Sequence, residues 1–529
     1  MLISIFLILF IAAWGIYTAR RLKRSVHMLQ QNAYRNERLI RWMKNNGKRA
    51  FPVQDSIPLL SIIVFLLLGE SIALLAGVVI YALLLFTWPK EQTKKQLVFT
   101  PRVKRLFTTI GVLYTVILVL SLVTGLHEER SFLFTFVPLI LASIVCYVMT
   151  ILANMVNWPI EMQINQHYFN DAEKRITSMP NLEVIGVTGS YGKTSTKHIL
   201  ETVLSADFNV LMTPESYNTK MGVTKTIRTK LKPYHELFIA EMGAKQEKDI
   251  EEICELVHHK YGMVTAIGEQ HLETFKTLDT IKKTKFEMVE TLPPEGTAFL
   301  NKDDENIMSY EQKNKCRTIY YGIDAEDLHY QAGDISFSAK GSSFKVYKYD
   351  GSSIDIQTKL LGRHNIYNIL AAIAMASEKG MELETIARAV RHVQPVEHRL
   401  ELKKPQGNIT IVDDSFNSNP TGASMALEVL GSMPEQKILV TPGMIELGEK
   451  EYELNKELAK QAADECDYII LVGKQQTKPL QDGLEEKDFP AERLYVASDL
   501  QDALSRMREW AQVPSVVLLE NDLPDTFNE

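Results

Sequence analysis

The sequence predicts an α/β protein with a helical membrane region at its N-terminus. Long apolar runs are concentrated before residue 157, and strand-like and helix-like segments alternate after it. Such alternation is typical of a mostly parallel sheet covered by helices. A chain of 529 residues is also too long for a single core. We therefore expect three regions, at 1–156, 157–396 and 397–529.

Composition narrows the class of protein. Hydrophobic residues make up 46% of the chain and charged residues 23%, which is ordinary for globular protein. The net charge of -7 and the pI near 6.0 show no excess of basic residues of the kind that binds nucleic acid. No nucleic-acid partner is therefore expected. The 4 cysteines form no CxxC pair, which argues against a zinc site and against a disulfide framework. This cysteine usage fits a reducing compartment.

Four apolar segments precede residue 157, at 3–19, 58–88, 107–125 and 132–156. The first is followed at once by "RRLKR", the reverse of a secretory signal, and so predicts an uncleaved anchor. The last two are long enough to span a bilayer. The second is interrupted by "GES", which predicts a bent hairpin that turns near Gly69 and Glu70.

Basic residues indicate the orientation of these segments. Lys and Arg number 10 in residues 20–50 and 6 in residues 89–106, which places both stretches on the cytoplasmic side. We therefore expect a multi-pass protein of the cell membrane, with three to five spans and cytoplasmic catalytic domains. Residues 20–50 form either a surface helix on anionic lipid or an ordinary positive-inside loop. Glu70 is either a functional group within the membrane or the tip of the hairpin.

A phosphate-binding loop follows the membrane region. "LEVIGVTGSYGKTSTKHILETVL" predicts a buried strand, a glycine-rich turn and a helix, whose N-terminus can bind a polyphosphate. Val187 stands where the general motif has its first glycine. We expect Lys193 to reach the phosphates and the Thr194 hydroxyl to ligate magnesium. The predicted nucleotide-binding residues of the loop are Thr188, Gly189, Ser190, Tyr191, Gly192, Lys193, Thr194 and Ser195.

This loop and four later segments resemble the Mur ligase superfamily of ATP-dependent acid–amino acid ligases. The chain looks most like the MurF branch, which adds D-alanyl-D-alanine to a UDP-muramoyl tripeptide. The resemblance covers residues 180 to about 475. It implies a central phosphate-loop domain with a mostly parallel sheet, and a Rossmann-like C-terminal domain. The later segments are "LFIAEMGA", "GEQHLETF" with "TKFEM", "LGRHNIYNIL", and "HRLELKK" with "ITIVDDSFNSNP".

Two magnesium ligands follow from the resemblance. Glu241 ends an apolar strand beside the loop, where a carboxylate faces the ligand crevice of a parallel sheet. Taken alone, this motif favours an exposed glutamate at a strand end. The resemblance implies that Glu241 binds magnesium and that His271 binds a second magnesium. A lone histidine is more often structural, so the role of His271 rests on the resemblance.

The resemblance also assigns a carbamylated lysine, which falls on Lys285 in "TKFEM". Carbamylation requires a lysine that can be neutral, and hence a buried lysine with a lowered pKa. Lys282 and Lys283 are nearby alternatives.

Three further contacts to ATP are implied. Asn365 and Asn368 would lie against the adenine, Asp414 would contact the ribose, and Arg399 would approach the γ-phosphate. The catalytic residues implied by the resemblance are Lys193, Glu241, His271, Lys285 and Arg399.

Departures from the family limit the substrate assignment. Membrane segments stand where MurF proteins have a UDP-sugar-binding domain. The chain ends in "VVLLENDLPDTFNE", where the family has a basic "KGS"-like stretch, and Phe416 replaces a common tyrosine. The resemblance thus implies an ADP-forming ligase that uses ATP and Mg2+. It would join an amino acid or dipeptide to a carboxylate of a cell-envelope precursor, such as a lipid-linked one, through an acyl phosphate.

Two other functions stay open at this point. Membrane-bound polyglutamate-type capsule synthetases share the Mur-type central domain, so a poly-amino-acid synthetase is the alternative enzyme. A membrane module that uses nucleotide binding to drive a conformational change is the alternative that is not a ligase.

Overall fold

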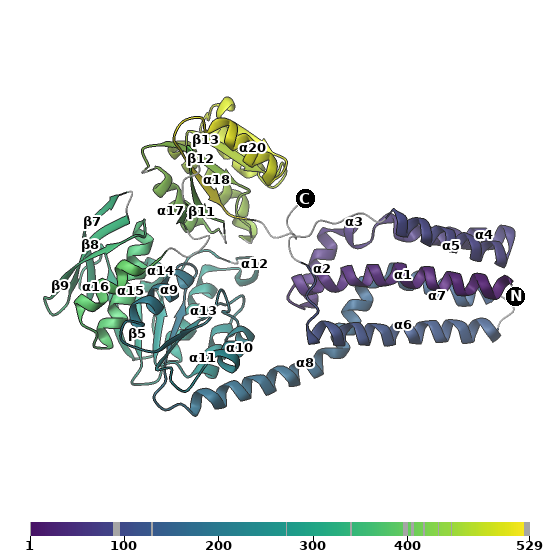
Figure 1. Ribbon diagram of the computed structural model, residues 1–529, viewed down its shortest axis with the longest axis horizontal. Coiled ribbons are helices and arrows are strands. Elements are labelled where there is room, and N and C mark those ends of the chain that lie inside the picture. Colours follow the sequence, from purple (N-terminus) through teal and green to yellow (C-terminus); the bar gives the residue numbers. More distant parts are fainter. Residues whose placement is uncertain are drawn as a thin grey trace. The chain divides into compact units, whose positions relative to one another are not determined.

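The computed structural model divides into two compact units, Met1–Gln166 and His167–Leu523 (Figure 1). The division lies inside a single helix, α8, Cys146–Thr177, whereas the sequence places the first boundary at 156/157. The residues that the structure describes are 2–87, 96–127, 131–270, 272–338, 341–394, 400–403, 407–415, 418–431, 433–445 and 447–522.

Helices are the only regular secondary structure in the described residues of the N-terminal unit. Within these residues, α1 and α6 are each long and apolar enough to cross a membrane. The predicted hairpin is present, because α4 and α5 are separated by Gly69 with φ +84°. The helices are α1 Leu2–Gln31, α2 Asn36–Asn45, α3 Gly47–Ala50, α4 Leu60–Leu68, α5 Glu70–Phe86, α6 Pro101–His127 and α7 Ser131–Ile144, with a 3-10 helix η1 at Val53–Leu59.

The fourth apolar segment differs from the expected straight run over 132–156. Helix α7 ends at Ile144, and α8 begins at Cys146 after a bend of 81°. The pair therefore counts as at most one broken span. The residues on either side of the bend are as apolar as any span, so hydropathy alone gave no sign of the break.

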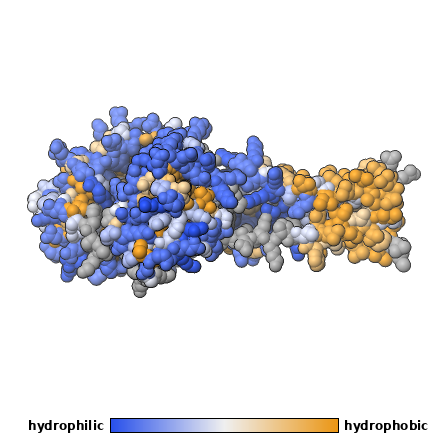
Figure 2. All heavy atoms as spheres, turned by 90° about the horizontal axis from the view of Figure 1, so that it is seen from above, coloured by the Kyte–Doolittle hydropathy of each residue, from blue (hydrophilic) through white to orange (hydrophobic). Residues whose placement is uncertain are grey.

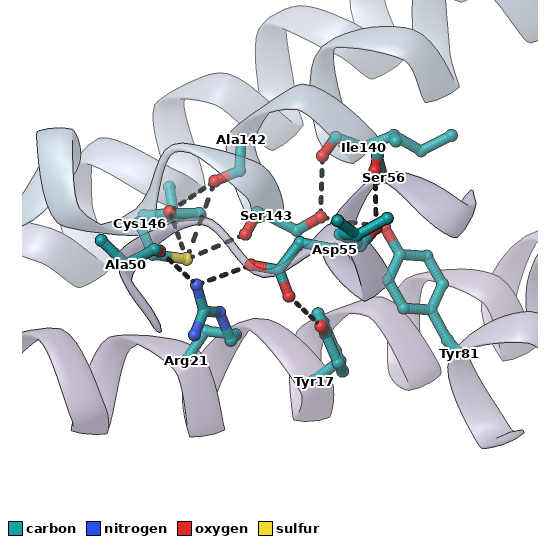
Figure 3. A network of polar contacts seen from close by, with 12 residues as sticks. Tyr17, Arg21, Ala50, Asp55, Ser56, Tyr81, Ile140, Ala142, Ser143 and Cys146 are labelled. Atoms are coloured by element: carbon teal, nitrogen blue, oxygen red, sulfur yellow. Dashed lines mark hydrogen bonds and ion pairs between the residues drawn. The ribbon is translucent and has the colours of Figure 1, made fainter. Parts of the chain in front are cut away.

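A buried polar network joins α1 to η1 (Figure 3). The Arg21 guanidinium, 1% exposed, lies 2.6 Å from Asp55 Oδ2 and donates to the Ala50 carbonyl at 2.8 Å. The Tyr17 hydroxyl donates to the other carboxylate oxygen of Asp55. A buried pair of charges needs such additional partners to offset its desolvation. The outer surface at one end of this unit, in contrast, is largely hydrophobic in Figure 2.

The second unit begins with a nine-stranded sheet in the order β2-β3-β1-β4-β5-β6-β7-β8-β9. Strands β1 to β7 pair in parallel, and β8 and β9 add an antiparallel edge. The predicted mostly parallel sheet is confirmed. Its strands are β1 Glu183–Thr188, β2 Val210–Met212, β3 Leu237–Glu241, β4 Tyr261–Val264, β5 Thr297–Asn301, β6 Arg317–Gly322, β7 Tyr330–Ser338, β8 Gly341–Lys348 and β9 Ser353–Thr358.

Helices cover both faces of this sheet, because alternate residues of each strand point to opposite sides. Ile185 and Ile239 face a core with α9, α15 and α16, whereas Val184 and Phe238 face a core with the end of α8 and helices α10, α11 and α13. The helices are α9 Lys193–Leu204, α10 Lys220–Lys230, α11 Asp249–Val257, α12 Leu272–Phe275, α13 Leu278–Glu290, α14 Glu305–Met308, α15 Arg363–Glu378 and α16 Leu383–His392.

A second sheet of six strands follows, in the order β10-β11-β15-β12-β13-β14. All of its pairs are parallel except β10 with β11, as expected for a Rossmann-like domain. The strands are β10 Glu401–Leu402, β11 Ile409–Asp414, β12 Gln436–Thr441, β13 Tyr468–Val472, β14 Leu494–Ala497 and β15 Ser515–Glu520. The helices are α17 Pro420–Gly431, α18 Glu451–Glu465, α19 Lys478–Glu486 and α20 Leu500–Trp510, with 3-10 helices η2 Gly448–Lys450 and η3 Ala491–Arg493.

Candidate nucleotide and metal site

The predicted phosphate loop links β1 to α9 and depends on two glycines. Gly189 has φ +151°, and a Cβ built there would stand 2.1 Å from Thr265 Oγ1. Gly192 has φ +81°, and its Cβ would stand 2.9 Å from Asn368 Oδ1. Both the backbone conformation and the close neighbours therefore require glycine. The turn ends at the N-terminus of α9, where backbone N–H groups favour an anion.

The segment that follows β4 holds this loop in shape. Thr265 Oγ1 donates to the Tyr191 carbonyl at 2.6 Å, and the Ser190 N–H donates to the Ala266 carbonyl at 2.7 Å. The Ser190 hydroxyl also donates to the Gly268 carbonyl at 2.9 Å. The conformation of the loop is thus fixed by contacts within the protein.

Glu241 lies at the end of β3 beside the loop, as predicted, and is 1% exposed. Its Oε1 accepts from Thr194 Oγ1 at 3.2 Å and from Asn218 Nδ2 at 3.0 Å. Its Oε2 lies 3.0 Å from Lys197 Nζ, whose side chain is fully buried. Lys197 also donates to the Glu215 carbonyl at 2.5 Å. The carboxylate is therefore held by three donors from two segments, helix α9 and the loop that contains Asn218.

The charge of Glu241 suits a hard cation. Burial alone would raise the pKa of its carboxyl, but Lys197 and Lys193 outweigh burial, and the pKa is lowered. The Thr194 hydroxyl and the Glu241 carboxylate then present oxygen donors at the loop, as magnesium prefers. Among the residues that the structure describes, no group of three or more His, Cys, Asp or Glu side chains is arranged for a metal. This donor set fits a magnesium ion that takes its remaining ligands from nucleotide phosphates and water.

The two predicted catalytic lysines lie near each other. Lys193 Nζ donates to the carbonyls of Gly189 at 2.7 Å and Ser190 at 3.0 Å, so it folds back over the loop. Lys285, on α13, is 3% exposed. Burial and, next, the charge of Lys193 lower the pKa of Lys285 well below 10.5. Lys283, one of the alternatives, is 69% exposed and pairs with Glu247, so of these two Lys285 alone has the buried setting.

A cavity of about 410 Å³ opens beside the loop. It lies between the first sheet and the second, within the same compact unit. The structure brings six of the predicted nucleotide contacts together in its lining: Tyr191, Gly192, Ser195, Asn365, Asn368 and Asp414. Helix α15 is tied to the loop here, because Thr196 Oγ1 donates to Asn368 Oδ1 at 2.9 Å.

Some predicted residues are not placed, and some functional candidates were missed. His271 and Arg399 lie outside the described residues, as does Phe416. Lys197 and Asn218, which hold Glu241, and Thr265, which holds the loop, were not identified from the sequence. Lys197 carried a usable signal: it lies four residues after Lys193, on the buried side of the helix.

The sequence of this unit matches the models of a known protein family. Residues 187–376 match the Mur ligase middle domain, and residues 398–520 match the Mur ligase glutamate ligase domain. Together the two matches cover more than half of the chain, which therefore belongs to the Mur ligase family.

The relatives within the family carry one name. The UDP-N-acetylmuramoyl-tripeptide–D-alanyl-D-alanine ligase of Escherichia coli is 31% identical over 294 residues, which are 55% of this chain and 65% of that protein. The ligase of the same name from Bacillus subtilis is 28% identical over 64% of this chain and 72% of that protein. The chain thus spans about two thirds of the relatives' length, and its candidate membrane helices lie outside the family matches.

Solved structures show the same fold. MurF from Acinetobacter baumannii has a TM-score of 0.61 and 24% identity over 69% of this chain and 78% of that one. MurF from Thermotoga maritima, solved in complex with ADP, has a TM-score of 0.60 and 22% identity over 68% and 80%.

Proposed function

We propose that this chain is an ATP-dependent, ADP-forming ligase of the cytoplasmic face of the cell membrane. It joins the carboxylate of a cell-envelope precursor to the amino group of an amino acid or dipeptide. The observation that carries this proposal is the convergence of the phosphate loop, Glu241 and the 410 Å³ cavity in one compact unit. The names of the curated relatives favour this reaction over polymer synthesis.

The chemistry assigns a role to each part of the site. A carboxylate oxygen of the acid substrate attacks the γ-phosphorus of ATP, so that ADP leaves and an acyl phosphate forms. The amine then attacks the acyl carbon and loses a proton, and inorganic phosphate leaves as the amide forms. Lys193 and the α9 N-terminus neutralise charge on the transferring group. Magnesium, held by Thr194 and Glu241, would supply further charge neutralisation.

The cavity accounts for the nucleoside end of ATP. Asn365 and Asn368 on α15 would contact the adenine, and Asp414 at the end of β11 would contact the ribose; all three line the cavity. His271 and Arg399 keep the roles implied by the resemblance, as a second magnesium ligand and as a γ-phosphate contact.

Lys285 is proposed to be carbamylated. Its burial and lowered pKa provide the neutral amine that reacts with CO2. Protein equilibrated with 13C-bicarbonate should show a carbamate carbon signal by NMR, and Lys285→Met should lose it. The exposed Lys283→Met variant is the matched control and should keep the signal. A carbamate signal that survives Lys285→Met would show that the modification is not on Lys285.

The acceptor is proposed to be lipid-linked, because apolar helices occupy the position of the family's UDP-sugar-binding domain. Full-length protein in nanodiscs should release ADP when supplied with a lipid-linked muramoyl peptide and D-alanyl-D-alanine together. Lys193→Ala should abolish this release, whereas the exposed Lys230→Ala should not change it. Equal rates with soluble UDP-muramoyl tripeptide would contradict the lipid-linked acceptor, and ADP release without any amine would contradict the ligase.

A further inference from the structure

The first half of α8, residues 146–162, has an inverted distribution of polar and apolar side chains. Four polar residues of this helix are buried: Thr150, Asn154, Asn157 and Glu161, between 0% and 6% exposed. Large apolar residues occupy the outer face, between 40% and 59% exposed: Val148, Leu152, Met155, Val156, Trp158 and Met162. A surface helix of a protein in water has the opposite arrangement.

The buried polar side chains are satisfied by other helices of the same unit. Thr150 Oγ1 lies 2.6 Å from Ser25 Oγ on α1, and Thr109 Oγ1 on α6 donates to Asn157 Oδ1 at 2.7 Å. Arg105 on α6 donates twice to Glu161, at 2.7 and 3.0 Å. These contacts fix which side of α8 faces the unit. The outward position of the apolar side is therefore a consequence of specific bonds rather than of loose packing.

The bend before α8 sets its direction. Helix α7 packs along α6, which is a candidate span. Because α8 leaves α7 at 81°, it cannot continue in the direction in which these helices cross. We propose that residues 146–162 form an interfacial helix, which lies in the boundary between headgroups and acyl chains and contacts lipid through its apolar face. This inference concerns the membrane unit alone and does not depend on the ligase chemistry.

A bilayer with anionic lipid is the partner that fits this surface. The outer face of α6 is equally apolar, with Val116 and Leu120 50% and 59% exposed, so the α8 face extends the same kind of surface. Trp158 suits the headgroup level, where aromatic side chains collect. Arg102, Lys104 and Arg105 precede the apolar part of α6, and Glu161 on α8 pairs with Arg102 and Arg105. The remaining positive charge at this level attracts anionic headgroups.

Spin labels can test this placement in the full-length protein. The native cysteines are buried, so a nitroxide reagent will react selectively with a cysteine introduced at Met155 or Met162. Two matched reference positions are Val116 on α6 and Val513 in the α/β unit, each 50% exposed. Accessibility to oxygen, which concentrates in lipid, and to a water-soluble nickel chelate is then measured by EPR in nanodiscs.

The proposal predicts that labels at 155 and 162 favour oxygen over the nickel chelate several-fold more than the label at 513. They should also be shallower than the label at 116. Water-like accessibility at both positions would overturn it. Protection from both reagents would also overturn the proposal, because it would show that protein covers the face. A depth equal to that of the label at 116 would overturn it as well, because it would show a span.

The anionic component has its own test. Nanodiscs of phosphatidylcholine alone are compared with nanodiscs that also contain phosphatidylglycerol. The label at Met155 should become less mobile with phosphatidylglycerol, and Lys104→Gln should reduce the difference. Identical spectra in the two lipid compositions would exclude a preference for anionic headgroups.

Discussion

At the scale of single residues, the Lys197–Glu241 pair determines how the carboxylate faces the phosphate loop. Both side chains are fully buried, and Lys197 contacts Oε2 while Thr194 and Asn218 donate to Oε1. A buried charge that loses its partner is far more costly than an exposed one. The pair therefore contributes to stability as well as to the geometry of the proposed metal site.

Lys197→Met should leave Glu241 buried without its ion-pair partner. We expect the free energy of unfolding of the α/β unit to fall by about 3–5 kcal/mol. It is measured by chemical denaturation of the full-length protein, followed through a signal from this unit. The exposed Lys230→Met variant is the control and should change it by less than about 0.5 kcal/mol. Adding Glu241→Gln to Lys197→Met should restore part of the loss. A double variant no more stable than the single variant would argue against a direct pairing.

His259 predicts a pH dependence of stability. It is 1% exposed, its Nε2 lies 2.7 Å from the Met288 carbonyl, and burial lowers its pKa from 6.5 to about 4. The unfolded chain therefore binds the proton at a higher pH than the folded chain. Stability should be fully present above pH 6.5 and should fall as the pH drops towards 4, with a slope of up to about 1.4 kcal/mol per pH unit.

This slope can be assigned to His259 by substitution. Denaturation of wild-type protein and His259→Gln is compared between pH 7 and pH 4.5. The variant should show a shallower loss of stability over this interval. Parallel curves for the two proteins would show that other groups cause the loss.

At the scale of elements, β1, the phosphate loop and α9 form one strand–turn–helix unit that was predicted from the sequence. The prediction succeeded because glycine spacing, a β-branched strand and a helical pattern are all local signals. The partners of the loop were not predicted. Thr265 reaches Tyr191 across 74 residues, and Asn218 reaches Glu241 across 23, so their roles arise only when parallel strands bring distant segments together.

Prediction from the sequence was limited in the same way for the helical unit, Met1–Gln166. Gly69 marked the turn of the α4–α5 hairpin, because glycine adopts the positive φ that the turn requires. The sequence gives no comparable signal for the break between α7 and α8 at Val145. It is fixed by contacts such as that of Tyr114, whose hydroxyl donates to the Ala142 carbonyl at 2.8 Å, and hydropathy does not report a contact between helices.

Gly189→Ala tests the strand–turn–helix unit. The new methyl group would stand 2.1 Å from Thr265 Oγ1, so the loop must shift. We expect at least a tenfold loss of Mg-ADP affinity by calorimetry, together with a lower melting temperature. Gly351→Ala is the matched control: it also has positive φ, +84°, but nothing lies within 4 Å of its Cβ. It should cost roughly 1–3 kcal/mol of stability and leave affinity unchanged. Equal affinity losses in both variants would rule out the proposed contact.

At the scale of the whole molecule, the chain divides into two compact units. The helical unit has its own core around Phe10, Tyr81 and Tyr147, and the α/β unit has separate cores on each face of its sheets. The family matches fall entirely within the α/β unit. ATP chemistry is thus proposed for one unit and membrane attachment for the other.

The transfer of oxygen from substrate to phosphate tests the central proposal most directly. Full-length protein in nanodiscs is given ATP, D-alanyl-D-alanine and a muramoyl peptide precursor whose reacting carboxylate carries 18O at both oxygens. The released phosphate is analysed by mass spectrometry. If the carboxylate attacks the γ-phosphorus, one 18O atom must appear in each phosphate that accompanies an amide. Amide formation with unlabelled phosphate, or phosphate release without amide, would contradict the proposed ligase mechanism.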